Sequence, residues 1–253
     1  MKLHLKPKQI TTITVLAAAA FPASLLAQTT TLSPVVDANT YVSSGQPTTS
    51  FSGKGAMEIA GPTTAQNNTE ESLVQFNTAT IQSDFNTDYG AGNWAVTAVT
   101  LTLFSNFPQG GVQPGNSSFN VIAPGGFELD WLSANNWTQS EITYNYMPNL
   151  LPGTGNNALD SLGDFNYQAN GTSPVTWSLN LDPNMVREID SGGLITIFGQ
   201  PTAGSTVGYL FNTTTQGNPP VLSVTVTEVP EPGIMALLVS GLAGLATVRR
   251  WKN

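Results

Sequence analysis

The chain of 253 residues contains no cysteine, and its single histidine, His4, lies near the N-terminus. Without cysteine there is no disulfide framework, thiolate zinc site, iron–sulfur cluster or thiol nucleophile. If the N-terminal segment is removed on export, no imidazole remains, which excludes a Ser-His-Asp triad, a histidine metal site and a histidine general base. We therefore expect a protein without enzymatic activity and without a cofactor.

Basic residues are also scarce, and most of them lie at the two ends of the chain. The only basic residues between Gln28 and Glu228 are Lys54 and Arg187. This range contains 15 acidic residues, so its net charge is −13. Nucleic-acid affinity comes largely from Lys and Arg neutralising phosphates, so nucleic acid is excluded as a partner. Acidic polysaccharides and anionic membrane surfaces would be repelled in the same way.

The N-terminal residues 1–27 are typical of a secretory signal peptide. Three lysines precede an apolar run over residues 13–26, and the small residue Ala27 stands just before Gln28. This order predicts export and cleavage between Ala27 and Gln28. The alternative is an uncleaved anchor, which Pro22 inside the short apolar run disfavours.

The C-terminal residues 229–253 combine a Pro-Glu-Pro sequence, a short apolar stretch and a basic end. The apolar stretch, residues 234–248, would span only about 22 Å as a helix, against about 30 Å for the hydrocarbon core of a bilayer. We expect it to form a short transmembrane helix, with the basic end on the cytoplasmic side. The alternative is a plain tail anchor.

In order and composition this tail resembles a PEP-CTERM sorting signal, and the residues that carry the resemblance are Pro230, Glu231, Pro232, Arg249 and Arg250. The resemblance implies recognition by an exosortase-type membrane enzyme, with cleavage near the Pro-Glu-Pro. Before that processing, the helix would hold the chain in the membrane. It also implies a Gram-negative bacterium that makes extracellular polysaccharide, with the protein in the cell envelope or the extracellular matrix.

The middle of the chain, residues 28–228, is rich in strand patterns. Residues 96–104 and 221–228 alternate apolar and polar side chains, the period of a half-buried strand. The only clear helix signal is Asp182 as N-cap with Gly192 after the end, and residues 78–85 favour a turn or a single helical turn. We predict an all-β fold, a single jelly-roll-like antiparallel β-sandwich. Further strands are expected at 35–43, 56–60, 72–77, 118–123, 139–145, 174–181, 194–199 and 206–212.

Six segments in order resemble the DNRLRE-type carbohydrate-binding modules, which are β-sandwich domains often attached to secreted polysaccharide-degrading enzymes. The family tends to carry arginine on its second segment, where this chain has Gln75 and Asn77. The resemblance implies the sandwich fold and a carbohydrate ligand, and the missing arginine points away from acidic sugars toward a neutral glycan. The six segments are residues 35–60, 71–81, 96–104, 136–148, 175–193 and 219–226.

Sugar binding needs aromatic faces for stacking and planar polar groups for hydroxyls. Residues 131–146 contain both aromatic and planar polar side chains. Trp137 and Tyr144, however, match hydrophobic positions of the resembled family's motif, which more often fill the core. Whether Trp131 and Tyr146 bind ligand or pack inside stays open. The candidate ligand-binding residues are Trp131, Trp137, Tyr146, Asn136 and Glu141.

Carboxylates offer the remaining chemistry. Without an EF-hand spacing, a structural Ca²⁺ is only one reading, and solvated loop carboxylates are the other. A glycosidase-type pair could come from Glu128 or Asp130 with Glu141. The functions that stay open are a surface or matrix protein that binds extracellular polysaccharide, a purely structural or adhesion protein, and a glycan-cleaving enzyme. The candidate calcium ligands are Asp37, Glu128, Asp130, Asp160 and Asp164.

Overall fold

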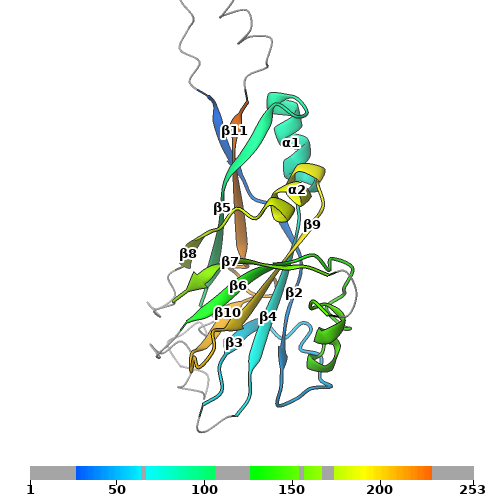
Figure 1. Cartoon of the computed structure of the whole chain (residues 1–253), viewed down its shortest axis with the longest axis vertical. Helices are drawn as coiled ribbons and strands as arrows, with labels where there is room; N and C mark the ends of the chain where they lie inside the picture. Colours follow the sequence, from blue (N-terminus) through cyan, green and yellow to red (C-terminus); the bar gives the residue numbers. More distant parts are fainter. Residues whose placement is uncertain (1–26, 64–66, 106–125, 154–156, 167–173, 230–253) are drawn as a thin grey trace, which may run out of the picture.

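The computed structural model describes residues 27–63, 67–105, 126–153, 157–166 and 174–229 (Figure 1). The predicted signal sequence before Ala27, the strand at 118–123 and the predicted membrane helix at 234–248 lie outside these ranges. Within them, no helix is both long and apolar enough to cross a membrane. The described part is mostly strand, arranged in antiparallel sheets, which confirms the predicted all-β class.

The first sheet has four strands in the order β1-β11-β5-β8, and every neighbouring pair is antiparallel. In β5 the side chains of Val99, Leu101 and Leu103 are buried, while the threonines between them are partly exposed. The period-2 pattern that predicted this strand is therefore the pattern of its burial. The four strands are β1 (Thr29–Leu32), β5 (Trp94–Phe104), β8 (Pro174–Leu179) and β11 (Val221–Glu228).

The second sheet has seven strands, with the path β10-β3-β4-β9-β6-β7 and with β2 pairing β4 at its side. Its pairs are also antiparallel. Three strands of the fold, β1, β6 and β7, were not predicted from the sequence. The seven strands are β2 (Val35–Ser43), β3 (Ala56–Ala60), β4 (Glu70–Asn77), β6 (Phe127–Leu132), β7 (Leu159–Phe165), β9 (Leu194–Pro201) and β10 (Gly208–Asn212).

The two sheets enclose the main hydrophobic core. Leu101 and Leu222 reach it from the first sheet, and Phe76 and Ile195 reach it from the second. Aromatic rings fill the centre, where the ring of Trp177 meets that of Phe127 edge to face at 5.4 Å. Burial of this apolar surface is the main force holding the sheets together.

A second core covers the opposite face of the second sheet. The sheet contributes Val42, Leu73, Leu132 and Phe198, and the segment 133–151 lies over them. We call the segment 133–151 the cover, because it shields this apolar face from solvent. It contains no strand. Its buried residues include Trp137, Ile142, Met147 and Leu150.

The prediction of a strand at 139–145 is wrong, because these residues belong to the cover. The chain there forms a turn and then a short 3₁₀ helix, η1 (Tyr144–Asn149). Buried residues in the cover follow an irregular spacing, which lets one segment span several strands. The alternation of Ile142 and Tyr144 in the sequence imitates a strand that the fold does not use.

Two helices complete the fold. α2 (Pro183–Ser191) has the predicted ends, since the Asp182 side chain accepts bonds from two backbone N–H groups and Gly192 adopts a φ of 72°. α1 (Ala79–Tyr89) is longer than the single turn predicted at 78–85. Each helix buries two apolar residues in the main core, which stabilises α1 despite its polar sequence.

Candidate functional site

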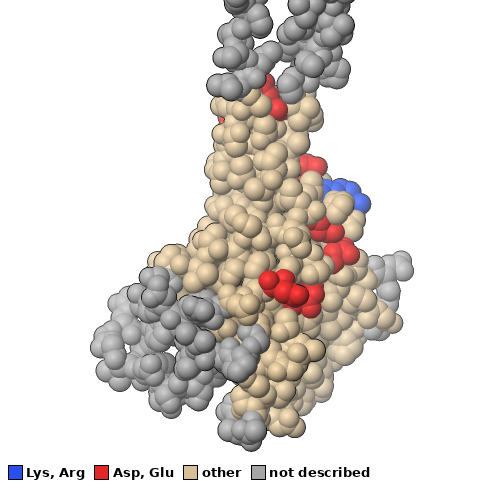
Figure 2. Space-filling model, turned by 60° about the vertical axis from the view of Figure 1, so that its left-hand side comes forward, with Lys and Arg blue, Asp and Glu red and all other residues tan. Residues whose placement is uncertain are grey.

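Charged side chains are sparse over the surface. Figure 2 shows acidic side chains gathered along one side of the view, while most of the described surface in that view is uncharged. The outer face of the first sheet is lined with hydroxyls that bond to one another across strands, for example Thr31 to Thr225 at 2.8 Å and Thr102 to Thr176 at 2.7 Å. A neutral polar surface of this kind is compatible with a neutral glycan but does not define a binding site.

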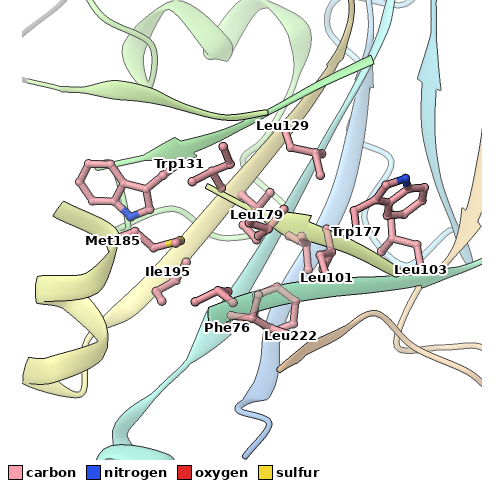
Figure 3. Packing of buried hydrophobic residues seen from close by; sticks show 14 of the residues in the cluster. Phe76, Leu101, Leu103, Leu129, Trp131, Trp177, Leu179, Met185, Ile195 and Leu222 are labelled. Carbon is pink, nitrogen blue, oxygen red and sulfur yellow. The ribbon is translucent and has the colours of Figure 1, made fainter. Parts of the chain in front are cut away.

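Trp131, a sequence-based candidate for ligand binding, lies between the two sheets. Its ring is 2% exposed and lies beside Met185 of α2 in Figure 3. Its indole Nε1 is buried without a hydrogen-bond partner among the described residues. In this position the ring packs in the core and offers no face to a ligand in solution.

Trp137 is also buried, and it fixes the cover to the second sheet. Its Nε1 donates to Thr196 Oγ1 at 3.0 Å, and the Gln75 side chain donates to the same hydroxyl at 3.2 Å and to the Asn135 carbonyl at 3.0 Å. Through its bond to Asn135, Gln75 ties β4 to the segment 133–151. The residue therefore has a structural role in this chain.

The other three candidates lie on the cover. Asn136 and Glu141 are exposed, and Tyr146 is half-buried against the second core. Trp131 lies on the opposite side of the second sheet from them, so the structure does not bring the five candidates into one site.

Three of the acidic candidates, Glu128 and Asp130 on β6 and Asp164 on β7, lie close to one another. Asp130 is buried on β6, accepts a bond from Gln200 at 3.0 Å, and has Glu128 and Asp164 close enough to repel its charge. Burial, together with these neighbours, raises the pKa of Asp130 to about 7. Protonation of Asp130 removes its repulsion with Glu128 and Asp164. Such a raised pKa is compatible with a purely structural carboxyl and with a general acid.

The remaining calcium candidates are placed apart from that cluster. Asp160 accepts a bond from the Asn184 side chain at 3.0 Å, and Asp37 is exposed on β2. In the part of the chain that the structure describes, no three Asp, Glu, His or Cys side chains are grouped as metal ligands would be. Glu141 is exposed on the segment 133–151 that covers the second sheet.

A group that sequence reasoning missed lies where β2, β3 and β4 meet, and we call it the aromatic–acidic cluster: Tyr41, Ser43, Phe51, Glu58 and Glu70. The Tyr41 ring stacks on Phe51 with centroids 4.2 Å apart. Ser43 donates to Glu70 at 2.9 Å. The cluster thus combines a half-exposed tyrosine ring with nearby carboxyls.

Burial dominates the electrostatics of this cluster. It raises the pKa of Glu58 to about 8, with repulsion from Glu70 adding to the effect. The pKa of Glu70 is raised by burial and held back by the bond from Ser43. Burial and the two carboxylates also raise the pKa of the Tyr41 hydroxyl. The sequence does not predict this cluster, because its members come from three strands and a loop that are brought together only in the fold.

The two ends of the described chain meet at one corner. β1 pairs β11 with Thr29 opposite Thr227, and the Glu228 N–H donates to the Gln28 carbonyl at 3.0 Å. The next residue, Val229, donates its N–H to the Asn93 carbonyl at 2.8 Å. The described chain therefore starts and finishes at the same end of the molecule, the upper end in Figure 1.

Comparison with known families identifies the segment that follows this corner. Residues 228–250 match the PEP-CTERM protein-sorting motif, which confirms the sorting signal predicted from the sequence. The motif implies an exported protein, associated with the cell surface or envelope, that an exosortase-type enzyme sorts and processes. Residues 230–250 of the match lie beyond the described residues.

The comparisons are silent on the sandwich. No curated protein matches the chain. The resemblance of residues 31–228 to DNRLRE-type modules finds no support in these comparisons. The sorting motif thus gives the destination of the protein, and the function of the β domain has to be inferred from its own residues.

Proposed function

We propose that this protein is a non-enzymatic component of the cell surface or exopolysaccharide matrix of a Gram-negative bacterium. The observation that carries the proposal is the sorting motif, which begins at the last residue of β11 and so joins directly to the β domain. The domain has no cysteine and only two basic residues, which suits a stable polar surface better than catalysis.

The finer proposal is contact with a neutral glycan through the aromatic–acidic cluster. Tyr41 stacked on Phe51 supplies a ring that is partly open to solvent, and Glu58 and Glu70 supply oxygens beside it. The Tyr41 to Phe51 stack is the observation that favours it, since stacking on aromatic rings is a principal means of holding sugars. The competing proposal is a purely structural or adhesion protein with no saccharide site.

A sedimentation assay with insoluble neutral polysaccharide separates these proposals. We expect the wild-type chain to bind, Tyr41→Ala to lose about tenfold or more in affinity, and Tyr146→Ala on the cover to bind as wild type. Loss in the second variant alone would place the sugar on the cover. Absence of binding to every neutral polysaccharide tested would leave the purely structural role.

Glycan cleavage is tested with the same protein. Polysaccharide incubated with the wild-type chain should yield no new reducing or unsaturated ends. New ends that disappear in Asp130→Asn would overturn the non-enzymatic proposal and point to the acidic cluster on β6 and β7.

A further inference from the structure

The sorting motif starts inside the folded domain. Its first matched residue, Glu228, is also the last residue of β11, and Val229 after it is still hydrogen bonded to the domain. Pro230 of the Pro-Glu-Pro sequence follows at once. Only Val229 stands between the end of β11 and the Pro-Glu-Pro sequence.

Both residues at this junction are held by separate elements. The Glu228 N–H bonds to Gln28 ahead of β1, and the Val229 N–H bonds to Asn93 ahead of β5. The hydroxyl oxygens of Thr227 and Thr97 lie 3.4 Å apart. The end of β11 is therefore held on both sides, by β1 on one edge and by β5 on the other.

The partner of Val229 is itself well supported. Asn93 donates to the Gly90 carbonyl at 3.1 Å, in a turn where Gly90 adopts a φ of 88° that favours glycine. The next residue, Trp94, packs on Phe85 of α1 with ring centroids 5.1 Å apart. Its Nε1 donates to the Asn86 side chain at 2.9 Å. The turn ties the junction to α1 as well as to the sheet.

Enzymes that cut or transfer a peptide bond take the substrate chain in extended form over several residues around that bond, and a chain paired on both edges of a sheet cannot enter such a cleft. We propose that the end of β11, residues 227–229, must detach from Gln28 and Asn93 before the sorting enzyme can process the motif. Local opening of strand ends is the low-energy motion that allows this. The inference rests on the proposed sorting of the protein and adds how the fold controls it.

The detachment gives the sorting step a dependence on folding. A chain whose β1–β11 corner is open is available to the enzyme at once, whereas a chain with the corner closed is processed only at the rate at which the corner opens. The opening of this corner therefore limits the processing rate.

A disulfide lock tests the proposal, because the chain has no other cysteine. The pairing of Glu228 with Gln28 by a backbone bond makes Thr29 and Thr227 a non-hydrogen-bonded pair, in which the Cβ atoms lie close enough for a disulfide. The lock is Thr29→Cys with Thr227→Cys in the full chain. The matched control lock is Thr102→Cys with Thr176→Cys, a Thr–Thr pair of the same sheet between β5 and β8.

The measurement is the fraction of chains that lose the tail with time, by intact mass, in cells that contain an exosortase-type enzyme. Non-reducing gels verify that each disulfide has formed. We expect the oxidised lock to slow processing about tenfold or more, and reductant to restore the wild-type rate. The control lock should stay within about twofold of wild type in both conditions, because Thr102 lies near the opposite end of β5 from the junction.

A linker separates the effect of the lock from other effects on the domain. A short flexible Gly-Ser insertion between Val229 and Pro230 should return the oxidised lock to the wild-type rate, because the motif then clears the closed corner. Wild-type processing of the oxidised lock, or a locked chain that the linker does not rescue, would overturn the proposal. A wild-type chain that is never processed would overturn the sorting function itself, an outcome distinct from both.

Discussion

Glu58 gives the domain an unusual response to pH. Its carboxyl has a pKa of about 8 in the fold, against an ordinary value of 4.5, mainly because it is buried and secondly because Glu70 is close. The folded state therefore binds more protons than the unfolded state between these two values. Stability is fully present at pH 4, falls as the pH rises toward 8, and changes little from this group above that.

The substitution Glu58→Gln removes this penalty while keeping the size and shape of the side chain. A pKa shift from 4.5 to about 8 corresponds to at most about 5 kcal/mol, at about 1.4 kcal/mol for each pKa unit. The side chain is partly exposed, so solvent screening reduces the effect, and we expect a gain of about 2 kcal/mol at pH 8. At pH 4 the wild-type carboxyl is protonated, and the variant should match it.

Urea unfolding at pH 4, 6 and 8 measures this difference. The control is Glu141→Gln, which neutralises an exposed carboxylate on the cover and should change the unfolding free energy by less than about 0.5 kcal/mol at each pH. An equal effect of Glu58→Gln at pH 4 and pH 8, or a variant less stable than wild type at pH 8, would refute the electrostatic reasoning.

Three further predictions test the core packing, the α2 cap and one tryptophan hydrogen bond. Leu101→Ala should lower the unfolding free energy by about 2–5 kcal/mol in urea titrations, because the side chain is fully buried in the main core. Asp182→Ala should lower it by about 1 kcal/mol through loss of the α2 cap, with Asp182→Asn close to wild type. Trp137→Phe should be more destabilising than Trp131→Phe by about 1 kcal/mol in thermal unfolding, since only the first loses a hydrogen bond, to Thr196. Equal losses for the two tryptophans would contradict the assigned bond.

The sequence predicted the strands whose two faces differ most. β5 and β11 alternate buried aliphatic residues with threonines, and the bounds of β2 and β3 agree with the predicted segments. Period 2 is readable there because one face meets the core and the other meets solvent. The caps of α2 were readable for a similar reason, since Asp182 and Gly192 act locally.

β6 and β7 were harder to find from the sequence. On β6, Phe127, Leu129 and Trp131 face the main core, but Asp130 is buried as well and reads in the sequence as a solvated carboxylate. β7 contains Gly163 at a φ of 134° and a register shift against β6, which obscure its pattern. In both cases tertiary packing decides what the local residues leave open.

The candidate site follows the same division. The sorting motif is contiguous, so its parts could be read in order from the sequence. The aromatic–acidic cluster joins residues from β2, β3, β4 and a loop, and only strand pairing brings Tyr41, Glu58 and Glu70 together. The ligand-binding prediction for Trp131 and Trp137 met the opposite difficulty, because a large aromatic residue has the same sequence signature inside a core as on a binding face.

The most direct test of the account is the mass of the chain recovered from the cell envelope or culture medium of cells that contain an exosortase-type enzyme. The motif implies that the tail is processed, so the wild-type chain should end near Pro230, Glu231 and Pro232 and lack the residues that follow. A variant with these three residues changed to alanine should keep its full C-terminus through Asn253. Recovery of the full-length wild-type chain, or the same truncation in both proteins, would contradict sorting through this motif.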